Sequence, residues 1–212
     1  MRSNVAAFAV TLLIAVAGAS PVSAHRRDEL LQAARIGVAA DRIEIELSLT
    51  PGIAVADDVI GAIDRDHDGA LSSEEQRSYA EQVLAATEVR IDDRIVKMEH
   101  AAAMYPLPGE LRNGDGAIEL RTAATLRALA SGRHEIVFTN GYRGDISVYL
   151  ANALKPDSER IVIASQHRDP EQRTLAIEFT IDGQRFAALP AWLFASGAGA
   201  WLIARRRLLP AS

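Results

Sequence analysis

Hydrophobic and polar side chains alternate along the chain between residues 30 and 50. The segment 42–50 alternates strictly, with Ile43, Ile45, Leu47 and Leu49 separated by polar residues. Successive side chains of a β-strand point to opposite faces, so this period of two predicts a half-buried strand. The segment 30–38 alternates less regularly, and we expect it to be the hairpin partner across residues 39–41.

The spacing of hydrophobic residues changes after Thr50-Pro51-Gly52. It becomes helical both before and after residues 64–75, which predicts two helices joined by a loop within 53–86. The hydrophobic positions are Val55, Val59, Ile60 and Ile63 before the loop, and Tyr79, Val83, Leu84 and Ala86 after it.

Strand-like segments return from residue 89 and are separated by turns rich in Gly, Pro, Asn and Asp. They are 89–91, 95–98, 117–124, 134–139, 146–150, 160–164 and 174–181. Many short strands with such turns are typical of a β-sandwich. We therefore expect a mainly β, β-sandwich-like domain over 25–185, with the helix–loop–helix inserted at 53–86.

Both ends of the chain have the pattern of membrane-handling segments. Residues 1–24 combine a basic start, an apolar run and Val22-Ser23-Ala24, which predicts a signal peptide cleaved after Ala24; an uncleaved membrane helix is the alternative. Residues 186–204 carry no charge and would span about 28 Å as a helix, which predicts a transmembrane helix. The alternatives are a buried terminal helix or a cleaved sorting signal beginning at Leu189-Pro190.

Arg205, Arg206 and Arg207 follow the apolar run and indicate that 205–212 is a cytoplasmic tail. The expected location is the periplasmic or extracytoplasmic face of the cell membrane, in a single-pass arrangement. A membrane or envelope protein is then the expected class of protein partner.

Composition narrows the possibilities further. The 212 residues include no cysteine, so the exported domain is expected to be held by packing and by a bound metal rather than by disulfides. The formal net charge of −5 argues against nucleic acid as a partner, because phosphate binding needs clustered Lys and Arg.

Residues 64–75 read D-R-D-H-D-G-A-L-S-S-E-E. Carboxylates stand at positions 1, 3, 5 and 12 of this segment, and a glycine stands at position 6, as a twelve-residue calcium loop requires. The ligands expected for Ca²⁺ are side-chain oxygens, the carbonyl at position 7 and a water-mediated contact at position 9. They belong to Asp64, Asp66, Asp68, Ala70, Ser72 and Glu75.

A simpler interpretation covers part of the loop, because Ser72 and Glu75 also match a helix N-cap with a capping box. It leaves the three alternating aspartates unexplained, and both roles are compatible. A second segment, Asn113-Gly114-Asp115-Gly116, imitates the middle of a calcium loop but lacks its first and last ligands. We interpret it as a hairpin turn. A lone helix pair must then be braced by the β-domain or by another copy of the chain.

The loop and its flanking helices resemble the EF-hand superfamily. The remainder is similar to uncharacterised exported bacterial proteins that contain an EF-hand. The resemblance lies in H-R-R-D-E-L-L-Q-A at 25–33, L-T-P-G at 49–52 and S-V-Y-L-A-N-A-L at 147–154. It supports the expected fold and implies no known activity. The residues themselves lead us to expect a calcium-binding, membrane-anchored module with a structural, interaction or accessory role.

A further metal chemistry is available at the predicted start of the exported domain. Cleavage after Ala24 would leave His25 as the first residue, where an amine and an imidazole together can chelate copper or nickel. His100, His134 or His167 would have to supply a further ligand, so this transition-metal role is the alternative function. The sequence contains none of the common catalytic motifs, and we expect no enzyme.

Overall fold

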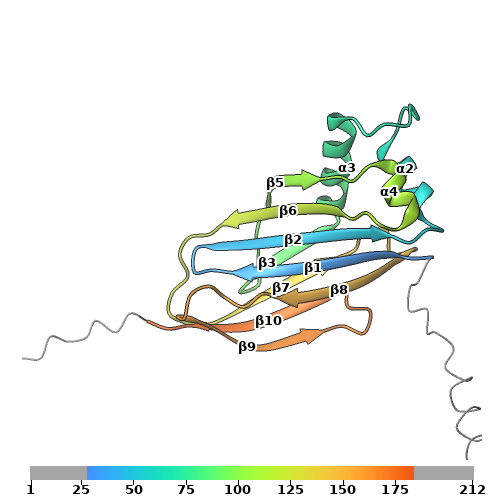
Figure 1. The fold of residues 1–212 in the computed structure, drawn as a ribbon. Helices are drawn as coiled ribbons and strands as arrows, with labels where there is room; N and C mark the ends of the chain where they lie inside the picture. Colours follow the sequence, from blue (N-terminus) through green and yellow to red (C-terminus); the bar gives the residue numbers. More distant parts are fainter. Residues whose placement is uncertain (1–27, 184–212) are drawn as a thin grey trace, which may run out of the picture.

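The structure, a computed structural model, describes residues 28–183, which form two five-stranded β-sheets packed face to face (Figure 1). The alternating segment at 42–50 is strand β2 (Arg42–Pro51), the middle strand of the first sheet. This sheet has the order β5-β6-β2-β1-β8. Its other strands are β1 (Leu30–Val38), β5 (Glu99–Met104), β6 (Ile118–Thr125) and β8 (Ser147–Ala153).

The second sheet has the order β4-β3-β7-β10-β9. Its strands are β3 (Thr87–Ile91), β4 (Arg94–Ile95), β7 (Gly132–Asn140), β9 (Ile161–Arg168) and β10 (Thr174–Ile181). Neighbouring strands pair antiparallel in both sheets except β1 and β8, which are parallel. The prediction of a mainly β, sandwich-like fold is confirmed, as is the hairpin between β1 and β2.

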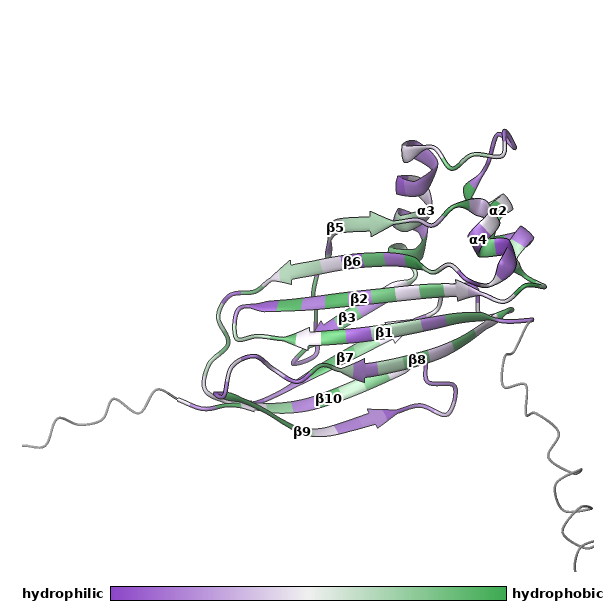
Figure 2. Ribbon diagram, in the orientation of Figure 1, coloured by the Kyte–Doolittle hydropathy of each residue, from purple (hydrophilic) through white to green (hydrophobic). Residues whose placement is uncertain are grey.

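A single hydrophobic core fills the space between the two sheets. The alternation along β2 is visible as alternating colours in Figure 2, and its Ile and Leu side chains are at most 2% exposed. At one end the core also holds polar groups. The buried Asn140 of β7 donates its Nδ2 to Oε1 of the buried Gln32 of β1 at 2.9 Å, which ties the second sheet to the first.

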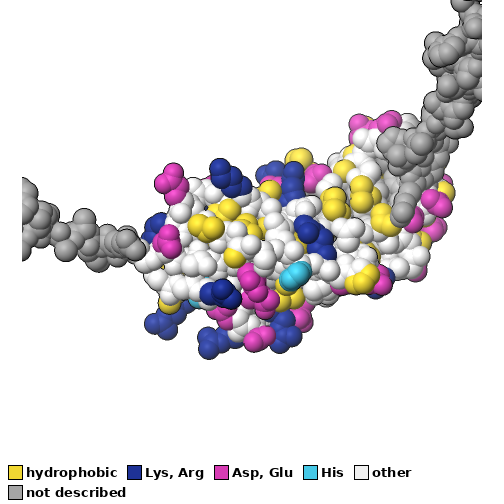
Figure 3. Space-filling model, turned by 90° about the horizontal axis from the view of Figure 1, so that it is seen from below, with side chains coloured by type: hydrophobic (Ala, Val, Ile, Leu, Met, Phe, Trp, Pro, Cys, Tyr) yellow, Lys and Arg dark blue, Asp and Glu magenta, His cyan; other side chains and the backbone are white. Residues whose placement is uncertain are grey.

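Strand β8 is the last strand of its sheet, and side chains of β9 cover part of its outer edge. Arg168 donates its Nε to the carbonyl of Ala151 at 2.8 Å, and Gln166 accepts the N–H of Ala153 at 3.1 Å. Backbone groups of an edge strand are a template for pairing with another chain, and these contacts occupy two of them. On the face seen in Figure 3, acidic and basic side chains of the described residues are mixed rather than gathered by sign.

Helices α2 (Ala56–Ile63) and α3 (Ser73–Ala85) lie between β2 and β3, as the sequence predicts. They carry the chain from the first sheet to the second and stand at one end of the sandwich, beside the short helix α4 (Pro108–Asn113) (Figure 1). The helices bury their apolar side chains in the same core as the sheets. The β-domain therefore braces the helix pair.

Several local predictions were wrong. The strand expected at 95–98 is only the two-residue β4, and β5 and α4 were not foreseen. The segment beginning at Asn113 is not a hairpin turn. It ends α4, where Gly114 is left-handed (φ 74°) and the N–H groups of Asp115 and Gly116 return to the carbonyl of Glu110. The remaining strands agree with prediction to within a few residues.

The predicted signal peptide at 1–24, the membrane helix at 186–204 and the tail at 205–212 lie outside the described residues. Between residues 28 and 183, no helix is long and apolar enough to cross a membrane.

Candidate metal centre

The loop at 64–75 begins where α2 ends, so its first ligand has a fixed position. The N–H of Asp64 donates to the carbonyl of Ile60 at 2.8 Å and continues the helical hydrogen bonding by one residue. Ile60 and Ile63 are buried in the core, and Asp64 itself is only 6% exposed. The packing of α2 thus holds this carboxylate close to the protein interior.

The structure brings three of the predicted ligands together. One carboxylate oxygen each from Asp64, Asp66 and Asp68 lies within 4.8 Å of the others. Calcium holds oxygens at about 2.3–2.6 Å, so two oxygens on opposite sides of one ion are about 5 Å apart. The spacing of the three carboxylates therefore fits a shared calcium ion, and it is the one such group among residues 28–183.

Backbone N–H groups of the loop orient these carboxylates. Asp64 accepts the N–H of Gly69 at 3.0 Å, and Asp66 accepts the N–H of Asp68 at 3.2 Å. Asp68 in turn accepts the N–H of Ala70 at 2.8 Å. Each aspartate thereby bends the chain toward itself, and this brings alternate side chains to the same side of the loop.

The loop also needs a left-handed backbone at two positions. Gly69 has a φ of 85°, as its place at the sharp turn predicts, and His67 has a φ of 59°. Glycine adopts such angles without steric cost, whereas His67 is one of the few other residues found there. His67 is exposed, as expected for a position that is not a ligand.

Glu75 accepts hydrogen bonds from two other residues of the loop, Arg65 near its start and Ser72 near its end. Its Oε1 accepts the N–H of Arg65 at 2.7 Å, and its Oε2 accepts the N–H of Ser72 at 3.0 Å and the Ser72 hydroxyl at 2.7 Å. The Ser72 hydroxyl, with these N–H groups, lowers the pKa of Glu75 to about 2. The carboxylate is therefore ionised, but it is not among the three that gather within 4.8 Å.

Ser72 caps α3 as predicted, and its capping box with Glu75 is complete. Leu71 packs against the core from position 8 of the loop. One turn beyond the cap, the carbonyl of Gln76 accepts the hydroxyl of Tyr105 at 2.7 Å. Both ends of the loop are consequently anchored to the sandwich.

A cluster of tyrosine rings joins α3 to the sheets, and the sequence did not reveal it. Tyr79 of α3 meets the rings of Tyr105 and Tyr142 edge to face, with centroids 6.3 and 5.7 Å apart. Tyr79 is 1% exposed, and its hydroxyl forms no hydrogen bond of ordinary geometry, although it interacts with the Tyr142 phenol. Burial, and then the neighbouring phenols, raise the pKa of Tyr79. Helical spacing placed Tyr79 in the core, but its partners come from distant segments.

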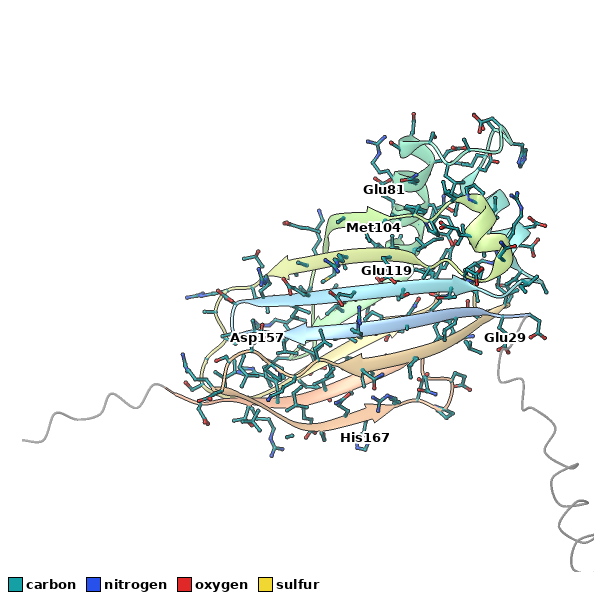
Figure 4. The ribbon with its side chains drawn as sticks, viewed as in Figure 1. Glu29, Glu81, Met104, Glu119, Asp157 and His167 are labelled. Atoms are coloured by element: carbon teal, nitrogen blue, oxygen red, sulfur yellow. The ribbon has the colours of Figure 1, made fainter. Side chains whose placement is uncertain are left out.

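The histidines considered for a transition metal have other surroundings. Burial alone would lower the pKa of His134, but hydrogen bonds to Asp92 (2.8 Å) and to the carbonyl of Ala130 (2.9 Å) outweigh it, and the pKa is raised. Burial would likewise raise the pKa of Asp92, yet the bonds from His134 and the Glu135 N–H leave it lowered. His167 is exposed on β9, on the opposite side of the molecule from Glu81 of α3 and Met104 of β5 (Figure 4). His25 lies outside the described residues.

No protein-family model matches the chain, and no curated protein matches its sequence. The interpretation of the site therefore depends on its own geometry and on the pattern of its residues.

Proposed function

We propose that the chain is a calcium-binding protein of the EF-hand type, in which residues 64–75 hold one Ca²⁺. The observation that carries this proposal is the gathering of the Asp64, Asp66 and Asp68 carboxylates within 4.8 Å of one another. Hard oxygen ligands at this spacing suit calcium. Glu75, ionised and anchored beside the loop, is the expected closing ligand, with Ala70 and Ser72 completing the set.

The site is proposed to serve an exported, membrane-anchored module with a structural, interaction or accessory role. Support for this part comes from the signal-like and apolar segments of the sequence. Calcium loops of extracellular modules bind with dissociation constants of about 10⁻⁴–10⁻³ M, which suits a compartment rich in calcium. A single helix pair built into a β-core favours stabilisation of the fold over a cytosolic switch.

Thermal unfolding of the full chain in detergent micelles tests the proposal. A tenfold excess of calcium over its dissociation constant adds about 1.4 kcal/mol to the free energy of unfolding. For a domain of this size, that raises the melting temperature by roughly 3–6 °C. Magnesium at the same concentration controls for ionic strength and should give a smaller shift.

Two adjacent substitutions separate ligation from general charge. Glu75→Gln should remove most of the calcium-dependent shift, because it removes the carboxylate that closes the site. Glu74→Gln makes the same change of charge at the neighbouring exposed residue and should leave the shift intact. A melting temperature indifferent to calcium and chelator in the wild type would refute the proposal.

A further inference from the structure

The turn at residues 141–146, between β7 and β8, touches helix α3, which follows the candidate calcium loop. Gly141 donates its N–H to the carbonyl of Ala86, at the end of α3, at 2.9 Å. Tyr142 meets the ring of Tyr79, which lies one helical turn after Glu75. Asp58 of α2 adds only a longer-range electrostatic attraction to Arg143. The contacts of the turn with the helix pair therefore come from α3.

The same turn is connected on its other side to the two sheets. The carbonyl of Tyr142 accepts Nε2 of Gln32 at 2.7 Å and the hydroxyl of Tyr149 at 2.8 Å. The carbonyl of Gly144 accepts the Arg173 guanidinium at 3.3 Å, and this guanidinium lies over the Tyr149 ring at 5.2 Å. Tyr149 and Arg173 line a cleft of about 370 Å³ formed by residues 147–149 and 170–173.

The backbone of the turn is strained. Arg143 has a φ of 46°, in the left-handed region that residues with a side chain rarely adopt. Such a conformation persists only where the surroundings hold it in place. The ion pair between Arg143 and Asp145 (3.3 Å) lies within the turn itself. The other contacts that keep the turn in this conformation come from α3 and the sheets.

Calcium occupancy would change how firmly α3 is packed against the turn. Without a cation, the carboxylates at 64, 66, 68 and 75 repel one another, which loosens the end of α2 and the start of α3. Local opening of this kind releases elements that have few other contacts. The turn keeps its hydrogen bonds to the sheets, so the part released is residues 141–143, where the Gly141 N–H and the Tyr142 ring depend on α3.

We propose that calcium binding at 64–75 sets the order of the 141–146 turn and, through it, the shape of the cleft lined by Tyr149 and Arg173. The coupling rests on the proposed function, since it needs the loop to bind calcium. It connects a cation site on the helix pair with a cleft at the junction of the two sheets. By linkage, the state with an ordered turn then binds calcium more tightly than the state with a disordered turn, by the factor through which calcium favours the ordered turn.

Hydrogen exchange of the full chain, followed by mass spectrometry in calcium and in chelator at equal ionic strength, tests the coupling. Amides of the turn should exchange at least about fivefold faster in chelator, the lower end of typical coupling between sites. Amides of β10 serve as the internal control for global unfolding and should change less. Bound calcium is measured on the same samples.

The outcomes are distinguishable. Calcium bound without any change in the turn, or with an equal change in β10, overturns the coupling and leaves calcium binding intact. Failure of the chain to bind calcium at all overturns the proposed function, and the coupling with it.

Discussion

Replacing Tyr79 by phenylalanine should stabilise the protein. The ring is 1% exposed, and its hydroxyl interacts with the Tyr142 phenol in a geometry poorer than that of an ordinary hydrogen bond. A buried polar group without a partner costs about 1–3 kcal/mol of desolvation free energy. Phenylalanine keeps the ring and both edge-to-face contacts, so no cavity opens. We expect the free energy of unfolding to rise by about 1 kcal/mol or more, as measured by urea denaturation at constant m-value.

Tyr105→Phe provides the matched control within the same cluster. Its hydroxyl donates to the carbonyl of Gln76 at 2.7 Å, and removing it should lower the free energy of unfolding by about 0.5–1.5 kcal/mol. The two substitutions delete the same atom from neighbouring rings and should have opposite signs. If Tyr79→Phe destabilises the protein as much as Tyr105→Phe, then the Tyr79 and Tyr142 hydroxyls are hydrogen-bonded to each other and the reasoning is refuted.

Three further predictions concern the loop and the far end of the sandwich. In chelator, Ser72→Ala should lower the free energy of unfolding by about 1 kcal/mol through loss of the α3 cap, and an unchanged melting temperature would contradict this. Gly69→Ala should lower the free energy of unfolding by about 1–2 kcal/mol. This cost comes from the φ of 85° alone, because a Cβ at this position meets nothing within 4 Å. A neutral result in the same melting assay would contradict the prediction. The lowered pKa of Asp92 contributes stability above about pH 4, and the raised pKa of His134 contributes it below about pH 6.5. Asp92→Asn should therefore lower the melting temperature most between these values and progressively less as the pH rises past the raised pKa of His134, and an effect that does not change with pH would count against the pairing.

The parts of the fold that depend on local pattern could be predicted from the sequence. Strict alternation defined β2, and helical spacing defined α2 and α3 on either side of the loop. The capping box of Ser72 and the left-handed Gly69 follow from short-range hydrogen bonding and backbone sterics, and the structure has both. The candidate ligands fall within twelve consecutive residues, so their grouping needed little knowledge of the tertiary fold.

Other parts depend on contacts between distant segments. Strand β5 contains three successive alanines, which favour strands weakly, and it forms because β6 offers it a pairing edge. Helix α4 ends in Asn113-Gly114, a pair that favours hairpin turns as much as helix ends. The parallel pairing of β1 with β8 and the meeting of Tyr79 with Tyr142 join residues far apart in the chain. No local pattern identifies such partners.

Equilibrium dialysis of the full chain against radioactive calcium tests the central claim most directly. We predict saturation at one calcium ion per chain, with a dissociation constant of about 10⁻⁴–10⁻³ M. Asp64→Asn and Asp66→Asn should each weaken this binding strongly, because they remove carboxylates from the group of three. Absence of saturable binding in the millimolar range, or binding that survives both substitutions together, would contradict the assignment of residues 64–75 as the calcium site.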